Sequence, residues 1–235
     1  MAWAAARPCP RACRGSERRN DRDSRPGFIL PQILEFHRNT RAAPGGVVMP
    51  LTHAPVLETP HLILRGPEPR DAEAVMAFLM DQRRAAGFGP AANRGEAWRW
   101  FALNIGHWHL HGYGYFTIED RETGAPSGIT GVWNPEGWPE PELGWVVFDG
   151  YEGRGIAYEA AQRARRYAYE DLGMTTLTSN IVPGNTRSIA LAERMGCWFE
   201  REYDNISMGR DFLYRHPGPE IVLGSAGDSP VEARA

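Results

Sequence analysis

Gly150-Tyr-Glu-Gly-Arg-Gly155 opens directly into a helical pattern, and this stretch decides the fold. The apolar run 142–148 before it predicts a strand, and the helix after it ends at Gly173. The start of a helix leaves backbone N–H groups unpaired and carries a partial positive charge. Glycines in front of it let the backbone approach a ligand closely. The sequence therefore predicts an anion-binding cradle that suits a pyrophosphate.

Two other phosphate-binding loops share part of this pattern. Gly150 and Gly155 have the separation of a Walker loop, but Ile156 and Ala157 stand where that loop needs Lys and Ser or Thr. A dinucleotide-binding fingerprint needs a third glycine, and Tyr158 occupies that position. Both differences argue against nucleotide hydrolysis and dinucleotide binding. A glycine-rich turn that merely connects a strand to a helix is the structural alternative.

The segment Glu152-Gly-Arg-Gly-Ile-Ala157 resembles the coenzyme A loop of GNAT N-acetyltransferases, usually written Gln/Arg-x-x-Gly-x-Gly/Ala. The wider stretch 153–160 is similar to the version of the ribosomal-protein N-terminal acetyltransferase branch. Glu152 stands where the family prefers Gln or Arg, which puts a side-chain contact to phosphate in doubt. The resemblance still implies a backbone cradle for coenzyme A, made by Gly153, Arg154, Gly155, Ile156 and Ala157.

A second segment, Asn185-Thr-Arg-Ser188 followed by a helix and Gly196, resembles the next motif of the same family. Asn185 is a good N-cap and Ser188 lies one turn further on, so simple capping of a structural helix is the alternative. The resemblance implies that Asn185 contacts the coenzyme. Many relatives carry a Tyr in this helix where Ala192 stands here. Ser188 is therefore our candidate for the group that protonates the departing thiolate.

An amine attacks a thioester only when it is unprotonated, so the site needs a base. Glu142 begins the strand before the loop, and it resembles the acidic residue that acts as base in relatives carrying Glu-Ile-Gly-Tyr. The alternatives are a solvent-exposed carboxylate at position 142 and a base at the neighbouring Glu140. The resemblance further implies that this strand splays from its neighbour. The pantetheine arm would then pair with the backbone of Val146, Val147 and Phe148.

Trp138 lies in the acidic stretch 134–142, which would attract an ammonium through charge and cation–π contact if it rimmed the acceptor pocket. A proline-stiffened loop is the alternative. His107, His109 and His111 invite a metal interpretation, but no Cys or carboxylate lies beside them in sequence. We expect no metal there. These histidines are either partly buried in an ordinary way or placed at the acceptor site.

The remaining pattern supplies the rest of a sheet. Asp71 is placed as the cap of one helix, and a second helix over 95–107 is expected to bury Trp98, Phe101 and Ile105 together with Ala102. The sequence predicts a single GNAT fold of the α/β (α+β) class, with a mixed, mostly antiparallel sheet of six to seven strands splayed at the coenzyme A site and about four flanking helices. The expected strands are 61–65, 113–119, 127–133, 142–148, 176–181, 198–203 and 208–215.

Charge divides the chain. Residues 1–48 hold nine Arg and four acids, about +5, so the net charge of −3 leaves −3 − 5 = −8 on the remainder. That acidic body argues against a nucleic-acid surface and suits a cationic substrate. We expect 1–48 to be disordered or a mis-assigned start, 50–220 to be the domain, and 221–235 to be a disordered tail. A basic nucleic-acid-binding arm is the alternative for 1–48.

No run of 18 apolar residues is present, so no transmembrane helix is expected. Three cysteines give no disulfide framework, and the cytoplasm is the expected compartment. Together these features predict an enzyme that moves an acetyl group from acetyl-CoA to a primary amine by direct attack with general-base assistance. The acceptor would be a protein N-terminus or a small molecule, and the protein a monomer or homodimer. The alternative is a non-catalytic acyl-CoA-binding regulatory module, which Ala192 and Glu152 favour.

Overall fold

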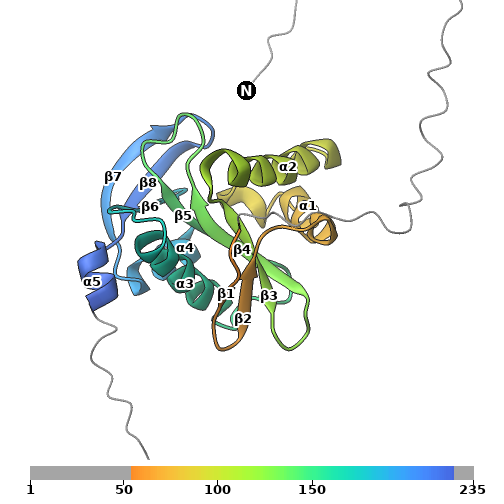
Figure 1. Cartoon of the computed structure of the whole chain (residues 1–235). Helices are drawn as coiled ribbons and strands as arrows, with labels where there is room; N and C mark the ends of the chain where they lie inside the picture. Colours follow the sequence, from red (N-terminus) through yellow and green to blue (C-terminus); the bar gives the residue numbers. More distant parts are fainter. Residues whose placement is uncertain (1–53, 225–235) are drawn as a thin grey trace, which may run out of the picture. The chain divides into compact units, whose positions relative to one another are not determined.

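Eight strands lie side by side in the order β1-β2-β3-β4-β5-β6-β8-β7 within residues 54–224, the part of the chain that the computed structural model describes (Figure 1). All neighbouring strands are antiparallel except β5 and β6, which are parallel. The strands are β1 (Leu57–Glu58), β2 (Leu62–Arg65), β3 (Tyr115–Asp120), β4 (Pro126–Trp133), β5 (Glu142–Val147), β6 (Thr178–Ile181), β7 (Trp198–Asn205) and β8 (Gly209–Arg215).

Helices cover both faces of the sheet (Figure 1). They are α1 (Ala72–Met80), α2 (Arg94–His111), α3 (Ile156–Glu170), α4 (Thr186–Arg194) and α5 (Pro219–Gly224), with short 3-10 turns η1 (Pro69–Asp71) and η2 (Ala85–Gly87). Successive residues of a strand point to opposite faces. Tyr115 of β3 accordingly packs with α1 and α2, whereas Phe116 and Ile118 pack with α3.

The predicted α/β class and the mostly antiparallel sheet are confirmed, while the numbers of elements differ. The described residues hold eight strands and five α-helices, against six to seven and about four predicted. The additional strand is β1, which is two residues long and too short to show an alternating pattern. The additional helix, α5, extends four residues into the stretch 221–235, for which no order was predicted. The predicted segment 1–48 lies outside the described residues.

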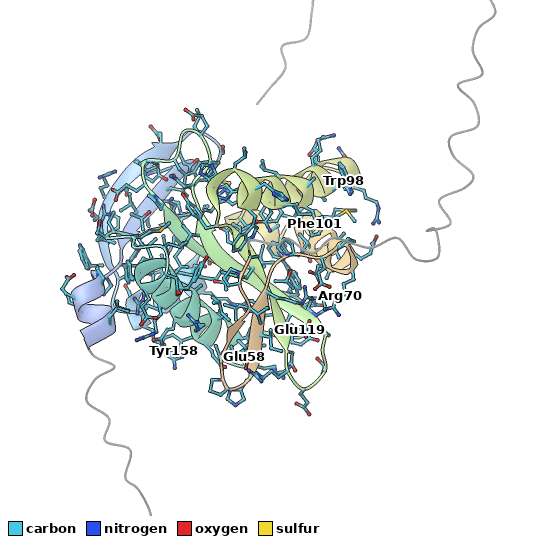
Figure 2. All side chains as sticks on the ribbon, in the orientation of Figure 1. Glu58, Arg70, Trp98, Phe101, Glu119 and Tyr158 are labelled. Atoms are coloured by element: carbon cyan, nitrogen blue, oxygen red, sulfur yellow. The ribbon has the colours of Figure 1, made fainter. Side chains whose placement is uncertain are left out.

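The buried face of α2 differs from the predicted one. Trp98 is 57% exposed and lies on the outer side of the helix, whereas Phe101 is buried beneath it (Figure 2). The buried face also includes Asn104, whose side-chain amide hydrogen-bonds to the backbone N–H and C=O of Tyr115 at 3.0 and 3.1 Å. A polar residue of this kind is tolerated inside because its hydrogen bonds are satisfied. A prediction from apolar periodicity does not count Asn104 as buried and therefore assigns the wrong side of α2 to the interior.

Asp71 does not cap α1 as predicted, because its side chain makes no hydrogen bond to the first turn of that helix. The carboxylate is fully buried and accepts hydrogen bonds from both terminal nitrogens of Arg65, at 2.8 and 2.9 Å. Thr117 donates a third bond at 2.9 Å. Burial acts to raise the pKa of Asp71, but the bonds from Arg65 and its other donors outweigh it and lower the pKa. The pair links β2 to β3 and to the start of α1.

We expect Asp71→Asn to lower the free energy of unfolding by about 3 kcal/mol, because it leaves the buried guanidinium of Arg65 without its bidentate partner. Denaturant unfolding measures the change. Glu73→Gln is the matched control, because Glu73 of α1 pairs with Arg94 of α2 on the exposed surface. Loss of this pair should change the free energy of unfolding little. Equal stability of the two variants would contradict this role for Asp71.

Candidate active site

β5 and β6 separate from each other almost as soon as they meet. Their parallel pairing is confined to Glu142 and Thr178, at the start of both strands. Beyond that point the hydroxyl of Ser179 donates to the carbonyl of Leu143 at 2.6 Å. A side-chain hydrogen bond thus takes the place of a backbone hydrogen bond between β5 and β6. The splay predicted between these strands is therefore present.

Backbone groups of successive residues in an antiparallel strand point alternately to its two neighbours. In β5, this alternation shows which backbone N–H and C=O groups face the gap between β5 and β6. Phe148 donates its N–H to the carbonyl of Ser127 at 2.8 Å, and its own carbonyl accepts from Tyr151 at 3.2 Å. Val146 occupies an equivalent position toward β4, paired with Ile129. The backbone groups of Val147 consequently point toward the gap, together with those of Trp145. Of the three predicted backbone contacts, Val147 is the one directed to the space between β5 and β6.

The glycine loop has the form of an anion cradle. Gly153 and Gly155 adopt positive φ angles of 75° and 81°, and a Cβ at either position would meet no atom within 4 Å. Gly155 is the N-cap of α3, and no side chain caps that helix. The first helical N–H groups, those of Ile156 and Ala157, therefore have no acceptor within the described chain. They face open space with the positive end of α3 behind them.

Charged side chains flank this loop. Arg154 donates to the carboxylate of Asp120 at 2.9 Å and lies over the ring of Tyr151. Glu152, which departs from the family pattern, pairs with Arg84 from the segment after α1. The guanidinium of Arg84 also binds Asp149 at 2.7 Å. A cation thus lies beside the position where the family usually carries Gln or Arg, although it comes from a distant part of the chain.

A cavity of about 370 Å³ lies at the splay. Its lining includes four predicted site residues, Trp138, Glu142, Asn185 and Ser188. Three loops close over it, as contacts at their glycines show. Gly87 packs against Asn185, Gly89 against Met208 and Gly137 against Ile206. Segments from before α2, from between β4 and β5 and from the β7–β8 turn therefore converge on one space.

Glu142 is partly buried in the wall of this cavity. Asn180 donates its amide to the carboxylate, and the hydroxyl of Tyr115 lies 3.4 Å from it. Tyr115 reaches Glu142 because Gly144 has no side chain; a Cβ there would lie 2.1 Å from the phenol oxygen. Desolvation raises the pKa of Glu142 to about 7, and the charge of Asp211 raises it further. The nearby indole N–H of Trp138 and the hydrogen bonds from Asn180 and Tyr115 oppose this rise. Such a carboxylate is suited to accept a proton near neutral pH.

Glu140, the competing base, is engaged elsewhere. Its carboxylate binds the guanidinium of Arg215 and the hydroxyl of Thr176, and the bond from Arg215 lowers its pKa. It is not among the residues that line the cavity. The geometry therefore favours Glu142 over Glu140.

Asn185 caps α4, as predicted, by accepting the N–H of Ser188 at 3.2 Å. The hydroxyl of Ser188 makes no hydrogen bond within the described chain, and both residues line the cavity. The side chains are thus placed together beside the splay. The capping bond uses the oxygen of Asn185 and leaves its amide N–H groups for a ligand.

His107 of α2 has a structural role. His107 donates its Nδ1 proton to the carbonyl of Tyr113 at 2.7 Å and accepts the N–H of Asn134 at Nε2, 3.2 Å away. Both ring nitrogens are occupied, and burial lowers the pKa of His107. His111 stacks on the ring of His107 with centroids 4.4 Å apart. Within residues 54–224 no group of three or more His, Cys, Asp or Glu side chains is placed to hold a metal ion.

A buried polar network supports the splay from behind. His216 lies 2.9 Å from the Ser179 hydroxyl through Nε2 and 3.2 Å from the Cys197 sulfur through Nδ1. Ser179 donates to Leu143, so its oxygen accepts the Nε2 proton, and Nδ1 accepts from the thiol. Burial lowers the pKa of His216 to about 3 and raises that of Cys197 to about 12. Both are therefore neutral and hold Ser179 in place.

The sequence analysis did not identify the three polar residues that act on Glu142 from other strands, namely Tyr115, Asn180 and Asp211. They come from β3, β6 and β8, and only the assembled sheet brings them to Glu142. One feature of the sequence could have indicated that Asp211 is buried. Asp211 alternates with the buried Leu213 in a strand, so it had to point inward.

The splayed sheet, the glycine loop and the cavity define an acyltransferase fold, and comparison with known proteins agrees. The family profile described as "Acetyltransferase (GNAT) domain" matches residues 61–197, and the chain belongs to this family. It is an acyltransferase of the GNAT type, a family that uses acetyl-CoA.

An acetyltransferase from Agrobacterium tumefaciens str. C58 is 35% identical, with a TM-score of 0.64 over 69% of this chain and 94% of that one. YkkB of Bacillus subtilis strain 168, a protein of uncharacterised function, is 25% identical over 62% of this chain and 86% of that protein. A putative ribosomal-protein-serine acetyltransferase from Vibrio cholerae shares the fold at 20% identity, with a TM-score of 0.60 over 72% of this chain and 100% of that one. No helix within residues 54–224 has the length and apolar character needed to cross a bilayer.

Proposed function

We propose that this protein transfers the acetyl group of acetyl-CoA to a primary amine, with Glu142 as general base. The observation that carries the proposal is the placement of one strand. β5 begins at Glu142, inside the cavity, and leads into the glycine loop and its unpaired helix amides. Six strand residues span about 20 Å, a length comparable to the extended pantetheine arm. One element thus sets the distance between the diphosphate site and the base.

Binding of the coenzyme uses the groups that the fold leaves free. The N–H groups of residues 153–157 receive the diphosphate, with the helix dipole of α3 behind them. The pantetheine amides pair with the backbone of Trp145 and Val147 in the gap between β5 and β6. The side-chain amide of Asn185, which lies beside Gly87 in the cavity wall, would donate to the bound coenzyme. The thioester would then lie in the cavity near Glu142.

The reaction needs one proton accepted and one returned. The amine nitrogen forms a bond to the thioester carbon, the C–S bond breaks, and the electron pair leaves with sulfur. Glu142 takes the proton that the nitrogen loses, directly or through a water. Ser188, whose hydroxyl makes no other bond within the described chain, is the candidate that protonates the thiolate. Asn180 and Tyr115 hold the Glu142 carboxylate in the orientation for this transfer.

Release of free thiol from acetyl-CoA in the presence of a panel of amines tests the proposed function. The panel contains alkylamines, diamines, amino acids and short peptides with free N-termini. We expect thiol release that depends on the amine, with the acetylated amine found in equal amount by mass spectrometry. Tight binding of coenzyme A without turnover on any of these amines would instead support the non-catalytic module.

The pH dependence of turnover should follow the ionisation of Glu142, whose pKa is raised to about 7. Only the carboxylate form accepts a proton, so kcat is expected to rise about tenfold per pH unit below pH 7 and to level off above it. Measurement of kcat from pH 5.5 to 9 at saturating amine shows this inflection. The inflection should disappear in Glu142→Gln; an unchanged profile in that variant would rule out Glu142 as its source.

A further inference from the structure

The charges around the cavity are all of one sign. Among its lining residues are three carboxylates, Glu136, Glu142 and Asp211, and no Arg, Lys or His from the described part of the chain. The other conspicuous lining residues are aromatic: Phe88, Trp100, Tyr115, Trp133, Trp138 and Trp145. Aromatic faces and carboxylates both attract cations, and a desolvated site strengthens the attraction. The lining of the cavity therefore favours binding of a cationic ligand.

Asp211 accepts and donates no proton in the acetyl transfer described above. It lies on β8 opposite Tyr203 of β7, and only 1% of its surface is exposed. One carboxylate oxygen, Oδ1, is buried and has no hydrogen-bond partner within residues 54–224. A buried carboxylate oxygen without a donor is costly, and desolvation raises the pKa of Asp211 in spite of an opposing hydrogen bond from Asn205. The side chain lines the cavity, so a guest that enters it could supply the missing donor.

A second unpaired acceptor lies in the same wall. Asn180 donates its amide to Glu142, while its own Oδ1 is buried and has no partner among the described residues. Glu142 and Asp211 are close enough for the charge of Asp211 to raise the pKa of Glu142. The cavity therefore holds two carboxylates within electrostatic reach, but it needs only one of them as a base.

We propose that the acceptor is a small molecule with two amino groups, of which one attacks the thioester beside Glu142 and the other is held as an ammonium by Asp211. This inference rests on the proposed function and names its substrate class. The reacting amine loses its proton to Glu142 and becomes an amide, whereas the second amine keeps its charge throughout. Asp211 is then a specificity-determining residue that binds substrate without taking part in proton transfer.

The test compares α,ω-diamines of three to six carbons with the monoamines of equal chain length. Wild-type protein should show kcat/KM about 100-fold higher for the preferred diamine than for its monoamine, because only the diamine supplies a cation for Asp211. The optimum should be sharp in chain length, because the two carboxylates are fixed on β5 and β8. Equal kcat/KM for diamines and monoamines, or a smooth rise with length in both series, would overturn the proposal.

Asp211→Asn removes the charge and keeps the shape of the side chain. We expect it to raise KM for the preferred diamine about 30-fold or more, whereas KM for the monoamine, which has no second cation to lose, should change far less. Both values are measured above pH 8, where Glu142 is ionised with or without the charge of Asp211. Asp204→Asn is the matched control, since Asp204 is exposed on the neighbouring strand β7 and does not line the cavity. It should leave both substrates unaffected. A cooperative unfolding transition in denaturant shows that the Asp211 variant is folded.

The outcomes separate this inference from the proposed function. Acetylation of peptide N-termini or monoamines in preference to diamines would overturn the diamine proposal and leave the acetyltransferase intact. Loss of the diamine preference in Asp204→Asn as well as in Asp211→Asn would assign it to net charge and overturn the role of Asp211. Absence of thiol release with every amine would instead contradict the proposed function itself.

Discussion

Replacing Glu142 by Gln should lower kcat about 100-fold or more and leave the affinity for acetyl-CoA unchanged. Gln keeps the shape of the side chain and its contact with Asn180, but it cannot accept a proton from the attacking amine. In the proposed binding mode the coenzyme is held by backbone groups of the loop and of β5, which the substitution does not change. Turnover and coenzyme affinity are measured separately, by thiol release and by calorimetry.

The pH dependence of stability is a second property in which Glu142→Gln should differ from the wild type. The folded-state pKa of Glu142 is about 7, above the ordinary 4.5, so the folded protein binds this proton more tightly than the unfolded chain. Stability associated with the residue therefore falls as pH rises from about 4.5 to about 7. At pH 8 the ionised carboxylate costs on the order of 3 kcal/mol, and Glu142→Gln removes this cost. We expect a higher Tm than wild type at pH 8 and little difference at pH 4.5.

The control for this experiment is Glu140→Gln, two residues away. Glu140 is paired with Arg215 outside the cavity, so its loss should lower stability slightly and leave the chemistry unaffected. Turnover that falls equally in both variants would show that the segment matters only as structure. Full turnover in Glu142→Gln across pH 6–9 would contradict the assigned base.

The second large effect is expected at the cradle. Gly155→Val should weaken acetyl-CoA binding about 100-fold or more, because Gly155 has a φ of 81°, a conformation that a β-branched residue adopts only with strain. The added methyl groups would also occupy the open space in front of the first amides of α3, where the diphosphate is proposed to bind. Calorimetric titration with acetyl-CoA measures the loss.

Gly173→Val separates strain from ligand contact. Gly173 follows the other end of α3 and has a φ of 64°, and a Cβ there would likewise meet no atom within 4 Å. Both substitutions should cost similar stability, but only the one at Gly155 should affect the coenzyme. Parallel losses of stability and of affinity in the two variants would show that the cradle has no specific part in binding.

The loop could be predicted from sequence because its function is local. An anion cradle at a helix start needs only glycines and the first helical amides, and all of these lie between residues 150 and 158. The cap at Asn185 is local in the same way. Glu142 could be placed because it begins the strand that leads into the loop. Each of these features depends on neighbours within one element.

The rest of the site depends on contacts between distant elements. Tyr115 of β3 reaches Glu142 of β5 across the intervening strand β4 only because position 144 is a glycine. Asp211 enters the cavity because β8 lies beside β6, an order that the chain reaches only after α4 and β7. Arg84 meets Glu152 although 68 positions separate them in the sequence. Patterns of hydrophobicity specify which residues point inward, but they do not specify which inward residues meet.

Calorimetric titration of the folded protein with acetyl-CoA tests the central claim most directly, because every further step needs the coenzyme held by the loop and the splay. We expect saturable binding with one coenzyme per chain, and much weaker binding of pantetheine, which lacks the diphosphate. No heat of binding at millimolar acetyl-CoA, or equal affinity for pantetheine, would contradict this claim.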